Sequence, residues 1–264
     1  MSEQKSFNPS QIWQTLREQA RQQGQKEPVL ASFLFSTILN HNSLASALSF
    51  HLANKLGSPT ASALMIREII EQAISADPSI VEAAYADLNA IDKRDSACCS
   101  LLTPLLFYKG FHALQCYRIA HFLWRQERRS LALLLQNRIS MVFSVDIHPA
   151  AQIGSGIMFD HATGIVIGET AVVEDNVSIM QAVTLGGTGK ESGDRHPKVR
   201  AGVLISAGAK ILGNIEIGAG AKVGAGSVVL KSVAPHTTVA GVPAKVVGCP
   251  NTEAPALEMD HKIS

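Results

Sequence analysis

Two short segments of the chain hold the side chains best suited to chemistry. The first, residues 186–198, is polar and rich in glycine. It contains six charged or titratable side chains, and four of them, Asp194, Arg195, His196 and Lys198, lie close together at its end. Arginine can hold a planar carboxylate through two parallel hydrogen bonds, and imidazole exchanges a proton near neutral pH. The second segment carries Asp160 and His161, and a positioned histidine can act as a general base. The residue types therefore indicate a binding loop and a candidate catalytic base.

Branched aliphatic residues that recur every six positions predict the scaffold beneath these segments. The run consists of Val199, Ile205, Ile211, Ile217, Val223 and Val229, with small residues between them. So short a repeat is typical of a parallel β-helix, in which each six-residue rung gives one strand and one corner and three rungs close a triangular coil. An earlier run obeys the same rule up to Phe159 and slips by two residues near Thr163. The slip predicts a bulged corner, and a second break between Leu185 and Val199 predicts an extruded loop.

Before residue 144 the apolar residues follow helical spacing instead. Proline or capping residues begin several amphipathic stretches, at Asn8, Pro28, Ser43, Thr60, Asp77, Pro104 and Ser130. The helix from Pro104 is expected to be a longer one that includes Phe122. We expect an α+β protein with an all-helical N-terminal domain (1–143), a left-handed parallel β-helix with an extruded loop (144–248) and a flexible C-terminal tail (249–264). The helical domain is expected to cover the open end of the coil and to support oligomerisation.

Composition and charge exclude several classes of protein. With 46% hydrophobic residues the 264-residue chain can form real cores, and a net charge of +1 without a long basic run predicts neither nucleic acid nor a membrane surface as a partner. A polar N-terminus and the lack of a long apolar stretch predict a cytoplasmic protein. Four cysteines, Cys98, Cys99, Cys116 and Cys249, have neither disulfide-framework density nor metal-site spacing, so we expect them to be reduced and mostly structural.

The motifs together resemble those of the bacterial serine O-acetyltransferase family. The most specific are Asp-His-Ala-Thr-Gly at 160–164 and Asp-Arg-His-Pro-Lys at 194–198. Further matching segments lie at 52–56, 109–115, 145–151, 184–189 and 240–245. The resemblance therefore covers both the helical domain and the β-helix. It implies direct transfer of an acetyl group from acetyl-CoA to the hydroxyl of L-serine, giving O-acetyl-L-serine and CoA in cysteine biosynthesis, without a metal or a permanently bound cofactor.

The resemblance also implies roles for individual residues. His161 matches the catalytic histidine, which removes the proton of the serine hydroxyl, and Asp146 matches the carboxylate that orients it. If Gly164 lies one coil above Asp146, the aspartate and His161 share an edge of adjacent coils. Arg195 and His196 match the ligands of the substrate carboxylate. Asp160 and Asp95 match the ammonium and amino-acid ligands, and the position of Asp95 between helices implies that the helical domain completes the pocket.

Acetyl-CoA is expected in the groove between two neighbouring β-helices. Candidate residues for its extended arm are Gly186, Gly187, Thr188, Ala207 and Ala225, and an amide near Gly187 could stabilise the thioester oxyanion. Lys222 and Lys245 are candidates for the CoA phosphates. For each lysine the alternative is an ordinary charge on a solvated face.

Assembly and regulation are further expectations from the resemblance. The family is typically a trimer-based hexamer, and L-cysteine is expected to compete with serine as a feedback inhibitor because the two differ by one atom. Members that bind O-acetylserine sulfhydrylase do so through a terminal isoleucine, whereas this chain ends Ile263-Ser264. Binding of that enzyme is therefore expected to be weak or absent.

Three other interpretations remain open from the sequence. A gamma-class carbonic anhydrase also has a β-helix, and His161 and His196 have a comparable spacing, but residues 199–201 offer no third zinc ligand. A hexapeptide acetyltransferase for sugars, or for another amine or alcohol, leaves the helical domain unexplained. A non-enzymatic scaffold could use the polar tail at 251–264 to dock a partner enzyme.

Overall fold

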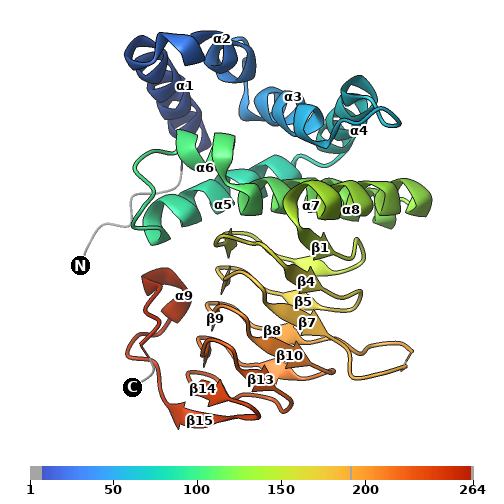
Figure 1. Ribbon diagram of the computed structural model, residues 1–264, viewed down its shortest axis with the longest axis vertical. Helices are drawn as coiled ribbons and strands as arrows, with labels where there is room; N and C mark the ends of the chain where they lie inside the picture. The colour runs from blue at the N-terminus through green and yellow to red at the C-terminus, as the bar shows by residue number, and fades with distance from the viewer. Residues whose placement is uncertain (1–7, 191, 263–264) are drawn as a thin grey trace.

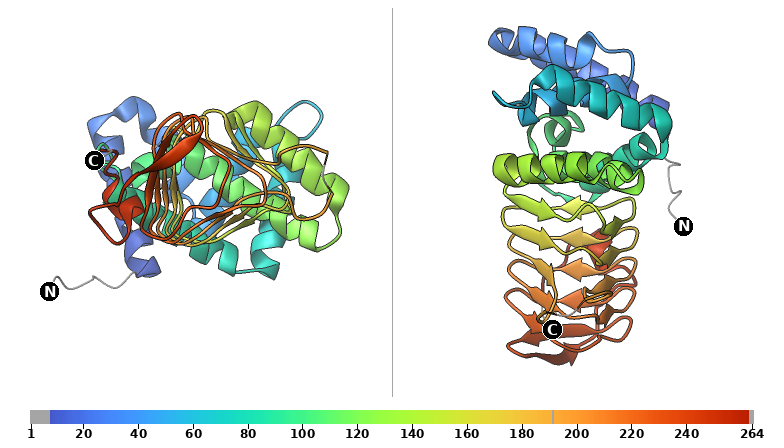
Figure 2. Two further views of the ribbon diagram at one scale, coloured as in Figure 1. Left: turned by 90° about the horizontal axis from the view of Figure 1, so that it is seen from below. Right: turned by 90° about the vertical axis from the view of Figure 1, so that its right-hand side faces the viewer.

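A layer of helices covers one end of a triangular prism of strands in the computed structural model, which describes residues 8–190 and 192–262 (Figure 1). The helical elements are α1 (Pro9–Lys26), η1 (Pro28–Leu30), α2 (Ala31–Leu34), η2 (Phe35–Leu39), α3 (Leu44–Leu56), α4 (Ala63–Ala76), α5 (Ser79–Arg94), α6 (Leu102–Phe107), α7 (Lys109–Arg125), α8 (Arg129–Phe143) and α9 (Pro255–Glu258). Helices α7 and α8 lie directly on the prism, and α1 to α4 form a second layer above them (Figure 2). The expected α+β architecture is confirmed.

The prism has three faces, which we name A, B and C after their sheets. Face A contains β1 (Val145–Ile147), β4 (Ile165–Ile167), β7 (Thr184–Gly186), β10 (Lys210–Leu212) and β13 (Val228–Val229). Face B contains β2 (Gln152–Ile153), β5 (Val172–Val173), β8 (Lys198–Val199) and β11 (Glu216–Ile217). Face C contains β3 (Met158–Phe159), β6 (Ser178–Ile179), β9 (Leu204–Ile205), β12 (Lys222–Val223), β14 (Thr238–Gly241) and β15 (Ala244–Gly248). All strand pairs are parallel except β14 with β15.

The six-residue period places branched side chains inside the prism. Val199, Ile205, Ile211, Ile217, Val223 and Val229 are all at most 2% exposed. They lie in β8 to β13 and face inward from the three sheets in turn. The backbone groups of each rung pair with the rungs above and below, so the coil buries its apolar column without open strand edges along its length.

The predicted slip is a bulged corner between β3 and β4. Val145 pairs with Ile165, twenty positions further on, whereas the regular coil takes eighteen, as between Lys210 and Val228. His161 and Ala162 absorb the extra length with left-handed backbone angles, φ +53° and +61°. Because the extra residues precede β4, Asp146 pairs with Val166, and the expected pairing with Gly164 is wrong.

The helix starts agree with the sequence at α1 and α3 and differ at several later helices. The side chain of Asn8 accepts hydrogen bonds at the start of α1, and Ser43 caps α3. Ser62 rather than Thr60 caps α4. The long helix expected from Pro104 is divided, because Tyr108 adopts an extended conformation (ψ 108°) between α6 and α7. This break directs α6 away from the axis of α7.

A buried polar network attaches the helices to the prism. The carboxylate of Asp87 in α5 is fully buried and accepts hydrogen bonds from Arg118 (2.7 Å), Gln115 (2.9 Å) and the backbone amide of Ile157 (2.9 Å). Arg118 also donates to the carbonyl of Gly154 at 2.8 Å. One set of charge-assisted hydrogen bonds therefore joins α5 and α7 of the helical layer to the corner between β2 and β3.

The tail is packed against face C, so the expectation of a flexible segment over 249–264 is wrong for the part that the structure describes. Ala256 is fully buried, and its carbonyl accepts a hydrogen bond from Ser178 at 3.0 Å. Ser206 and His261 are hydrogen bonded at 3.1 Å, and Lys222 donates to the carbonyl of Lys262 at 2.5 Å. Apolar residues within the polar tail explain the packing. The terminal Ile263 and Ser264, on which the sulfhydrylase expectation rests, lie outside the described residues.

A pair of buried histidines predicts acid sensitivity of the helical domain. His51 and His112 are 6% and 1% exposed, and their Nε2 atoms donate to the carbonyls of Leu106 and Leu105. Burial lowers the pKa of His51 to about 4 and that of His112 to about 3. Below pH 6.5 the unfolded chain binds protons that the folded chain does not, so the free energy of unfolding should fall by roughly 2 kcal/mol between pH 6.5 and 5.5.

Urea unfolding across that pH range measures the effect, with a His51→Gln and His112→Gln double variant as the control. The variant should lose the part of the pH dependence that these two histidines contribute, about 2 kcal/mol over this range. A wild-type free energy of unfolding that stays constant from pH 6.5 to 5.5 contradicts the prediction.

Candidate functional site

His161 projects from the edge between faces C and A. Its side chain is 72% exposed, and its Nε2 lies 3.9 Å from the carboxylate of Asp160. The left-handed backbone at His161 and Ala162 turns the chain sharply, and Ala162 is buried while His161 points outward. Strained backbone of this kind is concentrated at functional sites. The expected outward orientation of the histidine is confirmed.

Asp95 and Asp160 lie on the same side of the molecule as His161. Asp95 follows α5, where one carboxylate oxygen accepts a hydrogen bond from the amide of Ala97 and the other from the hydroxyl of Tyr108, both at 2.8 Å. The negative charges of Asp95 and Asp160 both act on the Tyr108 phenol, which places the two carboxylates around it. The helical domain thus supplies one wall beside the His161 corner. Tyr108 is a residue that the sequence interpretation missed.

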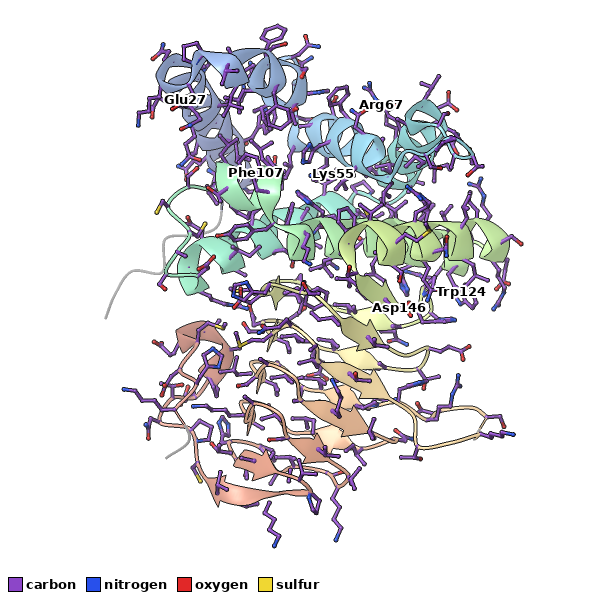
Figure 3. All side chains as sticks on the ribbon, viewed as in Figure 1. Glu27, Lys55, Arg67, Phe107, Trp124 and Asp146 are labelled. Atoms are coloured by element: carbon purple, nitrogen blue, oxygen red, sulfur yellow. The ribbon has the colours of Figure 1, made fainter. Side chains whose placement is uncertain are left out.

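Asp146 lies at the top of face A, beneath α8 (Figure 3). Its carboxylate accepts a hydrogen bond from Gln136 at 2.7 Å. His161, in contrast, points into solvent, and the structure describes no hydrogen bond between these two side chains. The orienting role of Asp146 stays a prediction, and it requires the imidazole to turn toward face A.

Arg195 and His196 lie at the other edge of face A, where the extruded loop leaves the prism between β7 and β8. Arg195 donates to the carboxylate of Glu169 at 2.7 Å, and this hydrogen bond holds the pKa of Glu169 below its usual value. The amides of Arg195 and His196 both donate to the hydroxyl of Thr170, at 3.0 and 3.1 Å. Glu169 and Thr170 belong to the preceding coil and were not singled out in the sequence.

The contacts of His196 fix its tautomer. The backbone amide of Thr170 donates to its Nδ1 at 3.2 Å, so Nδ1 carries no proton and the proton of the neutral ring lies on Nε2. Burial, followed by the charge of Arg195, lowers the pKa of His196. The ring therefore stays neutral at physiological pH, with an N–H that can donate to a carboxylate.

Gly168 makes room for that ring. A Cβ atom at position 168 would lie 2.1 Å from both Nε2 and Cδ2 of His196. Gly168→Ala should therefore displace the imidazole and raise the KM for serine about three- to tenfold, the cost of one weakened hydrogen bond. The melting temperature should also fall, because His196 is only 7% exposed and its ring has to move within a packed site.

Gly189→Ala is a matched control, since a Cβ there meets nothing within 4 Å. Steady-state kinetics with varied serine and saturating acetyl-CoA measure the difference between the two variants. Equal KM values for serine in the Gly168 and Gly189 variants would remove Gly168 from the site.

Residues expected to bind acetyl-CoA divide between the two edges of face A. Ala207 and Ala225 lie at successive corners below His161, joined by the hydrogen bond from the amide of Gly226 to the carbonyl of Ala207. Gly186, Gly187 and Thr188 begin the extruded loop at the other edge, beside Arg195. Lys245 is exposed on β15. Lys222 is only 3% exposed beneath the tail, so the alternative of a solvated surface charge is wrong for this lysine.

Face A therefore carries two different half-sites. The half-site at its edge with face C has a candidate base and two carboxylates, and the half-site at its edge with face B has a guanidinium and a neutral imidazole. The corner with His161 precedes a strand of face A, and the loop with Arg195 follows a strand of the same face. The two sets of side chains therefore lie on opposite edges of face A. Within a single chain, the candidate base and the Arg-His loop thus lie on different edges of the prism.

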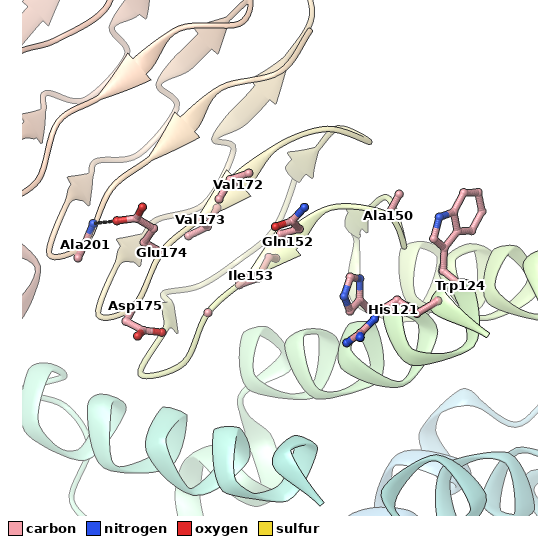
Figure 4. A pocket seen from close by; sticks show the side chains of 12 residues that line it. His121, Trp124, Ala150, Gln152, Ile153, Val172, Val173, Glu174, Asp175 and Ala201 are labelled. Carbon is pink, nitrogen blue, oxygen red and sulfur yellow. Dashed lines mark hydrogen bonds between the residues drawn. The ribbon is translucent and has the colours of Figure 1, made fainter. Parts of the chain in front are cut away.

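A large hollow lies elsewhere and has different chemistry. A cavity of about 770 Å³ opens beneath the C-terminal end of α7 on face B, lined by His121, Trp124, Gln152, Glu174 and Asp175 among others (Figure 4). Glu174 is already occupied by hydrogen bonds to Arg200 and to the amide of Ala201. Neither half-site borders this cavity, so its size does not make it the candidate active site.

Residues 8–190 and 192–262 contain no group of three or more histidine, cysteine or acidic side chains placed to hold a metal ion. Across the same part of the chain, every helix is too short or too polar to cross a membrane.

A parallel β-helix with hexapeptide rungs, an outward histidine at one edge and an Arg-His loop at the next defines a hexapeptide-repeat acyltransferase. The bacterial transferase hexapeptide family matches residues 196–231, and the family described as serine acetyltransferase, N-terminal, matches residues 12–116. A serine acetyltransferase from Salmonella typhimurium is 61% identical over 253 residues, 96% of this chain and 93% of the relative. The chain belongs to the serine acetyltransferase family, and its assignment as an acyltransferase is confirmed.

Solved structures agree with this assignment. The serine acetyltransferase of Vibrio cholerae superposes with a TM-score of 0.96 at 61% identity, covering 97% of this chain and 99% of the other. A serine acetyltransferase in complex with cysteine has a TM-score of 0.95 at 58% identity, with the same coverage of both chains. Other solved members hold CoA or, in the soybean enzyme, serine. The alternatives of a carbonic anhydrase, a sugar acetyltransferase and a non-enzymatic scaffold are therefore wrong.

Proposed function

We propose that this serine acetyltransferase works at sites shared between neighbouring copies of the chain, each site combining the two half-sites of face A. The separation of His161 from Arg195 on opposite edges of that face carries the proposal. Head-to-tail association around a three-fold axis would bring the C–A edge of one copy to the A–B edge of the next. A trimer, and a hexamer formed by two trimers through their helical layers, follows from this arrangement.

The chemistry at such a site is direct transfer. His161 takes the proton of the serine hydroxyl while the oxygen attacks the carbonyl carbon of acetyl-CoA, and Asp146 holds the imidazole in the correct tautomer. The tetrahedral intermediate then expels the CoA thiolate, which receives the proton from the imidazolium. A backbone amide near Gly187 would stabilise the oxyanion. No metal is required in this sequence of steps.

The two half-sites divide the substrate between them. Arg195 and the Nε2–H of His196 suit the carboxylate, while Asp95 and Asp160 suit the ammonium group. L-cysteine presents the same carboxylate and ammonium, so it competes for the same contacts and acts as feedback inhibitor. Family members solved with serine and with cysteine support the binding of both amino acids.

Acetyl-CoA would lie along the C–A edge below His161. The corners at Ala207 and Ala225 carry small side chains, and the extruded loop of the neighbouring copy, with Gly186 to Thr188, would cover the thioester. Lys245 is an exposed candidate for the phosphates. Lys222 can take that role only after the tail leaves face C. Members solved with CoA support binding of this cosubstrate.

Compartment and partner are proposed from the sequence. We place the enzyme in the cytoplasm, and we propose L-serine, acetyl-CoA and L-cysteine as the molecules that it binds.

Complementation between two defective chains tests the shared site. Arg195→Ala should lower kcat/KM for serine ~10- to 100-fold, the value of charge-assisted hydrogen bonds, and His161→Ala should also be defective. Co-expressed variants should regain about a quarter of the wild-type activity, because one in four random interfaces pairs an intact His161 with an intact Arg195.

The assay is serine-dependent release of CoA from the purified mixed oligomer. The matched control is a chain with both substitutions, co-expressed with the His161 variant, which cannot reconstitute the pair of residues. Activity of the mixed oligomer no greater than the average of the two single variants would place the complete site within one chain and overturn the proposal.

A further inference from the structure

Tyr108 connects the helical layer to the His161 corner. It is the single extended residue between α6 and α7, and its hydroxyl donates to Oδ2 of Asp95 at 2.8 Å. The other oxygen of that carboxylate accepts from the amide of Ala97 at 2.8 Å. Each carboxylate oxygen of Asp95 therefore accepts a hydrogen bond from its own donor. These two contacts fix the orientation of the carboxylate and so the directions in which its remaining lone pairs point.

The residues after Tyr108 are held against the corner itself. Lys109 donates a hydrogen bond to the hydroxyl of Thr163. Gly110 packs so tightly that a Cβ there would lie 2.2 Å from the carbonyl oxygen of Phe159. The segment 108–110 thus sets the position of the Tyr108 phenol relative to the turn that carries Asp160 and His161.

We propose that Tyr108 is a positioning residue for the amino-acid substrate, because its phenol fixes the carboxylate of Asp95 in the orientation that receives the substrate ammonium group. The inference rests on the proposed role of Asp95 as an ammonium ligand. Tyr108 acts through Asp95 and does not take part in acetyl transfer.

The surroundings of Tyr108 keep its phenol a neutral donor. Partial burial is the largest of the effects that raise the pKa of Tyr108. The hydrogen bond to Asp95 and the negative charges of Asp95 and Asp160 raise this pKa further. A neutral donor leaves the full negative charge of Asp95 available to the ammonium group, whereas a cationic partner such as lysine would neutralise it. The contact therefore orients the carboxylate without competing for its charge.

Tyr108→Phe removes the hydroxyl and keeps the ring. In the full-length oligomer the variant should raise the KM for serine about five- to tenfold, with kcat and the KM for acetyl-CoA within about twofold of wild type. The inhibition constant of 3-hydroxypropanoate, which is serine without its amino group, should not change. A merely structural role for the hydroxyl would affect both ligands equally.

A double-mutant cycle with Asp95→Asn separates this proposal from the one it rests on. Tyr108→Phe should raise the KM for serine in the wild-type background and add nothing in the Asp95→Asn background. If Asp95→Asn leaves the KM for serine unchanged, the proposed ammonium ligand is wrong. If Asp95→Asn raises the KM but Tyr108→Phe does not, or raises the inhibition constant of 3-hydroxypropanoate equally, the role of Tyr108 is wrong while that of Asp95 stands.

Discussion

Replacement of His161 by alanine should lower kcat by ~10²–10⁴, the contribution of a positioned general base. The serine hydroxyl is then left without a proton acceptor at the moment of attack. Because the His161 side chain is 72% exposed and makes few contacts, neither the melting temperature nor the oligomer should change appreciably. Initial rates of CoA release at saturating serine and acetyl-CoA measure the loss.

His236 offers a matched control for this substitution. It is also an exposed corner histidine with a left-handed backbone, φ +52°, but it lies near the far end of the prism. His236→Ala should keep wild-type turnover. Near-normal kcat in the His161 variant, measured on an oligomer of wild-type size, would exclude this histidine as the base.

Arg118→Ala should destabilise the protein by about 3–5 kcal/mol, the cost of leaving a buried charge without its partner. Arg118 and Asp87 are 8% and 0% exposed and lie 2.7 Å apart. The substitution leaves the Asp87 carboxylate with only neutral donors and removes the hydrogen bond to the carbonyl of Gly154. Chemical denaturation followed by circular dichroism measures the change in the free energy of unfolding.

A surface ion pair provides the comparison. Arg67 and Glu71 lie 2.8 Å apart on α4 and are 36% and 48% exposed, so Arg67→Ala should cost less than about 0.5 kcal/mol. The apolar double variant Asp87→Leu with Arg118→Met should recover only part of the lost stability, because the unpaired charge is removed but Gln115 and the amide of Ile157 lose their acceptor. A loss below about 1 kcal/mol for Arg118→Ala would mean that water or another group solvates Asp87.

The β-helix was predictable because its period is imposed by geometry within each coil. Val199 and the branched residues that follow it at six-residue intervals face inward whatever surrounds the coil. The pairing of Asp146 was not predictable in the same way. Two residues added at the 160–164 corner lengthen the pairings that span this corner, and the sequence does not reveal whether they fall before or after the strand begins.

Other errors arose where distant contacts outweigh local preference. Tyr108 interrupts an otherwise helical run because its side chain reaches Asp95 and the next residues contact the prism. The polar tail packs because face C offers Ser178 and Ser206 as hydrogen-bond partners. Neither partner is near in sequence, so composition alone suggested a continuous helix and a flexible end.

The candidate site was predictable as a set of residues and not as an arrangement. His161 and Arg195 were evident from their motifs, but their placement on opposite edges follows from the fold of the coil. Thr170 and Glu169 escaped notice because they lie 26 positions before His196 and Arg195 respectively. That spacing includes the extruded loop and so matches no multiple of the repeat.

The coil length restricts how this part of the chain can change in length. Pairs such as Lys210 with Val228 close a coil in eighteen residues, and the two departures, at 160–164 and 187–197, lie at corners and leave the following strands in phase. Any other insertion would turn inward residues outward in every rung that follows. Tolerated insertions and deletions should therefore be either whole coils of eighteen residues or loops that leave at a corner, and an evolving enzyme of this kind acquires new loops without rebuilding its core.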